Sequence, residues 1–221
     1  MSPEEAARRL AEYIHSLPDF VYYEVGDSYG HIGATIADAV LQPRRDYDTF
    51  VAPRTKRILT KWPQERTVTA MLQLLGSIPA SEFLNCEDNE DSGSWLGHRV
   101  ERFCTILQLL KGEGIESEAD LTAWLTIDTN LPKLHAINGV GPKTVDYLKI
   151  LVGVQGAGAA IDSRLREFLS MAGIVAARSD YDMPREIINR AADLLSVERS
   201  VLDHSIWRYM GGKDIAPCAW K

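Results

Sequence analysis

The most informative segment of the chain is Leu134–Thr144, which reads LHAINGVGPKT. A short helix is expected to end near Ile137, a Gly-x-Gly hairpin follows, and a second helix begins at Pro142. Glycine permits a positive φ and a close approach of backbones, and proline suits the first helical turn. Such a hairpin directs backbone N–H groups and the positive end of a helix outward, which favours an anion. A Gly-x-Gly pair alone usually marks a plain turn. Between two helices and before Lys143, it predicts a hairpin that grips phosphate.

An aspartate follows this hairpin at a defined distance. Beyond a glycine-containing segment from Gly153 to Gly158, Asp162 lies nineteen residues after Lys143. Together, the hairpin, the lysine and this aspartate resemble the helix-hairpin-helix of base-excision DNA glycosylases, in the endonuclease III and oxidised-purine branches. The resemblance implies an all-α, two-lobed glycosylase fold. It also implies that Lys143 and Asp162 are the catalytic pair of a DNA glycosylase with AP-lyase activity.

The resemblance is close over residues 134–169 and looser over most of the remaining chain. Ala39-Val40-Leu41-Gln42 is similar to the family's helix that ends in a glutamine near the DNA, and Asp203-His204-x-x-Trp207 is similar to its closing helix. Three departures leave the damaged base undetermined. The iron–sulfur loop of the endonuclease III branch is absent, Ser163-Arg164 replaces a small residue and a histidine, and Pro142 is typical of the alkyl-base branch, which lacks the lysine.

The residues themselves suit this chemistry. An amine can trap the sugar of a departing base as a Schiff base, but it must be neutral, and an exposed lysine titrates near 10.4. A position at a helix N-terminus in a cleft disfavours the cation of Lys143. Asp162 can stabilise positive charge at the sugar or move a proton. Two plainer interpretations stay open: Asp162 only caps the next helix, or Lys143 only neutralises a phosphate.

Helical periodicity dominates the chain. Apolar residues recur at intervals of three and four over 100–110, 165–169 and 187–195, and no stretch alternates as a strand does. Gly173 is placed to end the second of these helices. Ser2 and Glu5 predict a capping box at the first helix. By resemblance, residues 1–221 form a single glycosylase-like unit. A helical barrel of residues 30–155, with the hairpin at 137–144, makes one lobe, and residues 1–29 with 156–221 make the other, with Lys143 opposite Asp162 in the cleft between them.

The net charge of −7 argues at first against nucleic acid, but its distribution is uneven. Residues 42–66 carry seven Lys and Arg against three Asp and Glu, a local net charge of +4. One basic face is therefore possible, although charges scattered over a solvated surface explain the pattern equally well. The expected partner is double-stranded DNA with a damaged base or an abasic site, and the expected location is cytoplasmic and nucleoid-associated. No apolar run is long enough to cross a bilayer.

Three cysteines, Cys86, Cys104 and Cys218, are too few for an all-cysteine iron–sulfur cluster. The sequence also lacks clustered metal ligands, so we expect neither a metal site nor a cofactor. The family resemblance allows a monovalent cation on the hairpin carbonyl groups.

DNA contacts are expected from the hairpin and from the end of the glutamine helix. The predicted contact residues are Gly139, Val140, Gly141, Thr144, Gln42, Arg44 and Arg45, with Arg54 as a further candidate. Four aromatic residues are candidates for stacking on an extruded base, although buried structural aromatics are commoner; they are Tyr22, Tyr23, His204 and Trp207. Two alternative functions remain, a non-catalytic helix-hairpin-helix DNA-binding module and a helical protein-interaction domain. The sequence does not identify the damaged base, the opposite-base preference or the oligomeric state.

Overall fold

The computed structural model describes residues 1–86 and 98–211, and within these ranges it contains twelve α-helices and no strand. The all-α fold class predicted from the sequence is therefore confirmed. The chain divides into two compact units. Unit 1 comprises Met1–Gly26 and Gln155–Lys221, and unit 2 comprises Asp27–Val154. No helix among the described residues is both long and apolar enough to cross a membrane.

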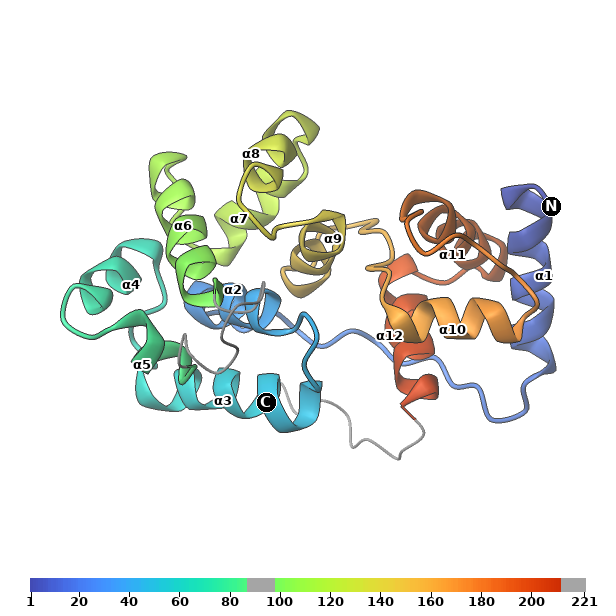
Figure 1. Ribbon diagram of the computed structural model, residues 1–221, viewed down its shortest axis with the longest axis horizontal. Helices are drawn as coiled ribbons and strands as arrows, with labels where there is room; N and C mark the ends of the chain where they lie inside the picture. The colour runs from blue at the N-terminus through green and yellow to red at the C-terminus, as the bar shows by residue number, and fades with distance from the viewer. Residues whose placement is uncertain (87–97, 212–221) are drawn as a thin grey trace. The chain divides into compact units, whose positions relative to one another are not determined.

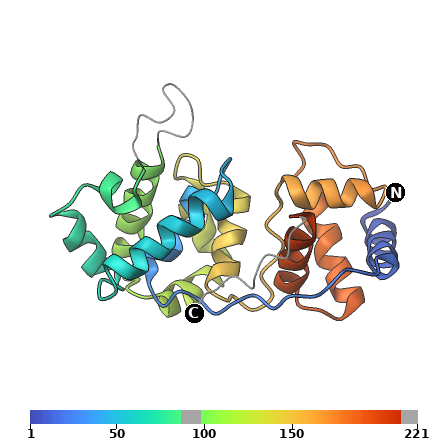
Figure 2. The same ribbon diagram turned by 90° about the horizontal axis from the view of Figure 1, so that it is seen from below.

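Unit 1 contains four helices: α1 Pro3–Ser16, α10 Ser163–Met171, α11 Asp182–Leu195 and α12 Arg199–Met210. The predicted capping box starts α1, since the Ser2 hydroxyl accepts from Glu5 N–H and the Glu5 carboxylate accepts from Ser2 N–H. α1 lies alongside α11, and α10 packs against α12 (Figures 1 and 2). Leu10, Phe168 and Ile187 are fully buried in the apolar core that these contacts form.

Unit 2 is built around α2 Ile32–Leu41, whose residues are all buried. Around it pack α3 Ala52–Lys61, α4 Val68–Leu75, α6 Arg99–Gly112 and α9 Pro142–Leu151 (Figure 1). The remaining elements are the π-helical turn η1 Tyr47–Val51, α5 Ala80–Leu84, α7 Glu118–Leu125, the short 3-10 turn η2 Asp128–Asn130 and α8 Leu131–His135. A helix buried on every side needs apolar residues all round, and IGATIADAVL supplies them with two exceptions, Thr35 and Asp38.

The three predicted apolar helices are confirmed. Residues 100–110 lie in α6, 165–169 in α10 and 187–195 in α11. Gly173 follows α10 with φ +72°, a conformation that favours glycine, as its predicted role in ending that helix requires.

Candidate active site

The Gly-x-Gly hairpin lies between α8 and α9 in unit 2. The turn is closed by a hydrogen bond from Val140 N–H to Ile137 O at 3.0 Å. Gly139 has φ +80°, in the left-handed region. The buried side chain of Arg102, on α6, donates from Nε to Asn138 O at 2.9 Å. A Cβ atom on Gly139 would lie 1.9 Å from Arg102 Nη2. The first glycine is therefore required by backbone conformation and by a packed guanidinium.

The second glycine, Gly141, differs from the first in backbone conformation and in packing. Gly141 is the N-cap of α9, with φ −94° and ψ 179°, which is extended backbone open to any residue. A Cβ atom placed on it would meet no atom within 4 Å. Neither turn geometry nor packing among the described residues requires glycine at this position. A group from outside the protein that approaches this backbone would explain the absence of a side chain.

These two environments predict responses of different size to the same substitution. Gly139→Ala is expected to lower the free energy of unfolding by about 1–3 kcal/mol, because alanine is strained at positive φ and displaces Arg102. Gly141→Ala is expected to change it by less than about 0.5 kcal/mol. Urea unfolding followed by circular dichroism measures both values. Equal destabilisation by the two substitutions would contradict this account of the hairpin.

Other hairpin residues are turned inward. The side chains of Val140 and Thr144 are buried, at 4% and 7% exposure, and Thr144 N–H donates to Gly141 O at 3.0 Å. Among the described residues, the N–H groups of Gly139 and Gly141 donate to no protein acceptor. Any anion held by this hairpin would therefore meet the amides of the two glycines rather than those of Val140 and Thr144.

Lys143 lies in the first turn of α9 and is partly buried. One turn later on the same face, Tyr147 donates from its hydroxyl to Oδ1 of Asp38 at 3.0 Å. Asp38 Oδ2 accepts from Tyr29 at 2.5 Å and from Tyr47 at 3.3 Å. The carboxyl group of Asp38 is completely buried. We call Asp38 with these three tyrosines the tyrosine–aspartate cluster.

Electrostatics connect this cluster to Lys143. Burial raises the pKa of Asp38 to about 6, while the three tyrosine hydrogen bonds and the charge of Lys143 act in the opposite direction. Burial and the neighbouring carboxylate raise the pKa of Tyr29 well above its usual value. The sequence reasoning missed this group. The available signal was a single carboxylate in the largely apolar segment that forms α2.

Asp162, in unit 1, is the N-cap of α10, and its Oδ1 accepts from Leu165 N–H at 3.0 Å. The buried segment that precedes it is fixed by side chains from three places in unit 1. Ala159 N–H donates to Asn189 Oδ1 at 2.9 Å, and Ala160 N–H donates to Asp203 Oδ1 at 2.9 Å. Ile161 N–H donates to the Tyr181 hydroxyl at 3.3 Å. The carboxylate is thus held in a defined position, and capping of α10 is observed.

A surface hollow in unit 1 places cationic residues beside Asp162. Its lining includes Ser163, Arg166 and Arg178. The guanidinium of Arg166 is held by Asp180 O at 2.7 Å and Ala177 O at 3.2 Å. Glu167 also lines this hollow, so two carboxylates face two guanidinium groups and their formal charges balance.

The four candidate stacking residues also lie in unit 1, in unequal environments. Arg208 lies over the ring of Tyr23 at 3.9 Å, and Arg164 lies over that of Trp207 at 4.3 Å. His204 stacks on Trp207 with centroids 6.4 Å apart, and burial followed by the charge of Arg208 lowers the pKa of His204 to about 4. Guanidinium groups thus cover one face of Tyr23 and of Trp207. Tyr22, which is 41% exposed, is the most accessible of the four.

Near Gln42, in unit 2, the basic segment forms an arginine cluster around one ring. Gln42 is the C-cap of α2, and Arg44 is exposed with φ +58°. The guanidinium carbons of three arginines lie 4.8, 3.7 and 5.6 Å from the Phe50 centroid; they belong to Arg45, Arg54 and Arg99. Two of the predicted basic residues, Arg45 and Arg54, thus share one aromatic ring with Arg99.

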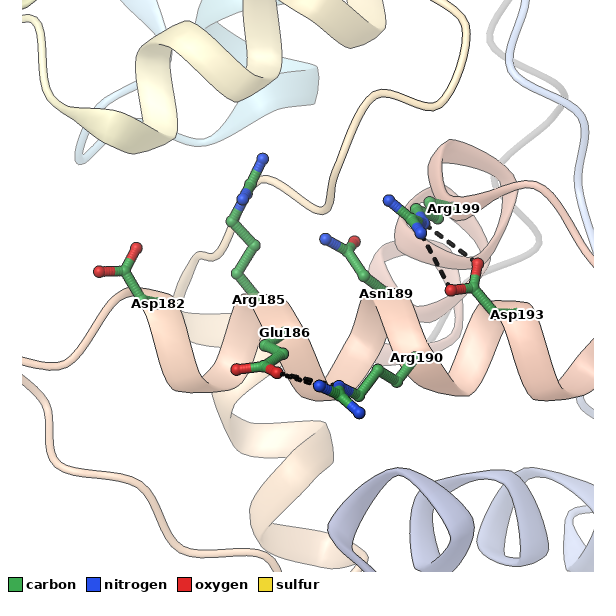
Figure 3. Close-up of a pocket in the computed structure, with 7 residues that line it drawn as sticks. All are labelled: Asp182, Arg185, Glu186, Asn189, Arg190, Asp193 and Arg199. Atoms are coloured by element: carbon green, nitrogen blue, oxygen red, sulfur yellow. Dashed lines mark hydrogen bonds and ion pairs between the residues drawn. The ribbon is translucent and has the colours of Figure 1, made fainter. Parts of the chain in front are cut away.

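A second groove in unit 1 contains none of the predicted residues. It is lined by α11 and the start of α12, and Figure 3 shows Arg190 paired with Glu186 at 2.6 Å and Arg199 paired with Asp193 at 2.9 Å. Because these carboxylates balance the arginines, the groove gives little attraction for phosphate.

Within residues 1–86 and 98–211, no group of three or more His, Cys, Asp or Glu side chains is arranged to hold a metal ion. Cys218 lies outside the described residues. No protein-family model matches the chain, and no curated protein matches it.

Proposed function

We propose that the protein is a DNA glycosylase with AP-lyase activity, built on the two-lobed helix-hairpin-helix glycosylase fold. The observation that carries the proposal is the hairpin. The amides of Gly139 and Gly141 donate to no acceptor in residues 1–86 and 98–211, Gly141 has open space where a side chain would be, and Lys143 follows in the first turn of α9. Amides at the N-terminus of a helix bind phosphate well, and an adjacent amine can attack the sugar that this phosphate carries.

In the proposed reaction Lys143 is the nucleophile. Its amine forms a bond to C1′ of the sugar, and the damaged base leaves with the electrons of the broken glycosidic bond. The C1′–O4′ bond then opens, the ring oxygen takes a proton, and a Schiff base forms between C1′ and the Lys143 nitrogen. Loss of a proton from C2′ expels the 3′ phosphate and so cleaves the strand. Asp162 supplies the negative charge that stabilises the oxocarbenium-like sugar. The base must leave the helical stack, because C1′ is otherwise out of reach of the enzyme.

We assign DNA binding to two kinds of group, the backbone amides of the hairpin and polar or charged side chains. The amides of Gly139 and Gly141 contact phosphate, and Gln42, Arg44 and Arg45 contribute beside them. Val140 and Thr144 are assigned to holding the hairpin in shape, since both side chains are buried. Tyr22 is the favoured stacking residue, because it is the most exposed of the four aromatic candidates.

A panel of duplexes, each carrying one damaged base or an abasic site, tests the proposal. Base release together with strand cleavage in the absence of alkali is the expected result. Cleavage only after alkali would indicate a glycosylase without lyase activity. Binding without any cleavage on the whole panel would favour a non-catalytic DNA-binding module.

Gly141→Val is expected to weaken binding to every duplex by about 10- to 100-fold, whichever lesion it carries, because the side chain keeps phosphate from charge-assisted amide hydrogen bonds. Fluorescence anisotropy with labelled duplexes measures the affinity. Affinity should fall with salt concentration with a shallow slope, since side chains neutralise few phosphates.

Gly112→Val is the matched control, because a Cβ atom there also meets open space. Both variants should fold as the parent protein does. A folded Gly141→Val variant with normal affinity would show that the hairpin does not contact DNA.

A further inference from the structure

The tyrosine–aspartate cluster has no role in the function proposed above. A fully buried carboxylate is costly unless it is hydrogen-bonded and balanced by charge. Asp38 accepts three hydrogen bonds, from Tyr29, Tyr47 and Tyr147, but these neutral hydroxyl groups do not balance its charge. The tyrosine–aspartate cluster therefore calls for a role in the chemistry of the protein.

Helix geometry relates Asp38 to Lys143. Lys143 and Tyr147 are four residues apart on α9, so their side chains share one face. The Tyr147 hydroxyl reaches Asp38 Oδ1 at 3.0 Å, which shows that this face of α9 is directed at Asp38. The charge of Lys143 acts on the Asp38 carboxyl group, in agreement with this arrangement. Lys143 and the whole cluster belong to unit 2, so their relation is fixed within one compact unit.

We propose that Asp38 accepts the proton that Lys143 must lose before its amine attacks the sugar, and that the three tyrosine hydroxyls hold the carboxylate for this task. The inference rests on the proposed function and adds a proton acceptor to it. Asp162 is then left with the stabilisation of positive charge at the sugar.

The proton transfer is balanced. The Lys143 ammonium becomes a neutral amine as the Asp38 carboxylate becomes a carboxylic acid. On an abasic site the amine lone pair forms a bond to the aldehyde carbon C1′, and the aldehyde oxygen leaves as water with one proton from the nitrogen and one that Asp38 gives back through solvent. Ammonium and aldehyde are thereby converted into an iminium ion and water without any added reagent.

A proton acceptor must be ionised to act, so the rate should fall as the pH drops through the pKa of Asp38, which is about 6. The groups that act on its carboxyl are Tyr29 before α2, Tyr47 of η1, and Tyr147 and Lys143 of α9. Tyr147→Phe removes a hydrogen bond to the ionised form, so it should move this acidic limb to higher pH.

The experiment measures the rate of reductive trapping on an abasic duplex between pH 5 and 9, with cyanoborohydride as reductant. Asp38→Asn should slow trapping near pH 7 by about 100-fold or more, in the range of general base catalysis. It should also abolish the midpoint near pH 6, so that the rate keeps rising with pH across the measured range because Lys143 then loses its proton only to solvent. Circular dichroism checks the fold of each variant.

Three results would overturn the role of Asp38. Faster trapping in Asp38→Asn would show that the carboxylate only stabilises the ammonium ion. Slower trapping with an unchanged acidic limb would show a purely structural role. An unchanged pH dependence of Lys143 acetylation in Asp38→Asn, measured without DNA by mass spectrometry, would show that the two groups do not interact. An intact protein that never traps DNA would instead overturn the proposed function itself.

Discussion

Replacing Lys143 with glutamine is expected to abolish the covalent protein–DNA adduct that borohydride forms on an abasic or damaged duplex. Borohydride reduces a Schiff base to a stable amine, and glutamine has no amine to form one. Binding of the same duplex should be largely preserved, because the amides of Gly139 and Gly141 are unchanged. Denaturing electrophoresis detects the adduct, and anisotropy measures the binding.

Lys149→Gln is the control, since it removes a second lysine from the same helix, α9, and should leave trapping intact. Adduct formation that survives in Lys143→Gln would assign the reaction to another amine, such as Lys149 or the N-terminus. If the intact protein forms no adduct on any substrate, the lyase assignment fails.

Asp162→Asn is expected to reduce base release by two to three orders of magnitude while the protein remains folded. Asparagine keeps an oxygen that can accept from Leu165 N–H, so the cap of α10 survives. The substitution removes the negative charge proposed to stabilise the sugar, an effect worth roughly 2–4 kcal/mol in comparable cases. Single-turnover kinetics on the best lesion substrate measure the loss.

This substitution separates the two explanations of Asp162, because a residue that only caps a helix predicts nearly normal turnover. Asp120→Asn is the matched control, since Asp120 belongs to the capping box of α7 and is proposed to have no catalytic role. If both variants release base at the parent rate, Asp162 is a capping residue alone.

Local signals in the sequence were sufficient for the helices and their ends. Ser2 and Glu5 form the capping box of α1, one glycine ends α10, and an apolar period marks α6. Each of these depends on neighbours within one or two turns. The same holds for Asp162 as an N-cap, whose partner lies three residues away.

The supporting groups of the site could not be predicted in this way. Tyr147 reaches Asp38 across 109 positions, and Arg102 reaches Asn138 across 36. No pattern in one sequence records which distant side chains meet, since that depends on how α6 and α9 pack around α2. The sequence also could not show which aromatic rings have a free face for a base, because the guanidinium groups over Tyr23 and Trp207 belong to neighbouring helices.

The contact between Arg102 and the hairpin has an evolutionary consequence. The guanidinium occupies the space where a side chain at position 139 would lie, so each residue restricts what selection can accept at the other. A bulkier residue at position 139 fits only after Arg102 has been replaced by a shorter side chain. That replacement leaves Asn138 O without the hydrogen-bond donor that Arg102 provides. Among descendants of a common ancestor, the two positions should therefore covary, with the glycine lost only in lineages that have already lost the arginine.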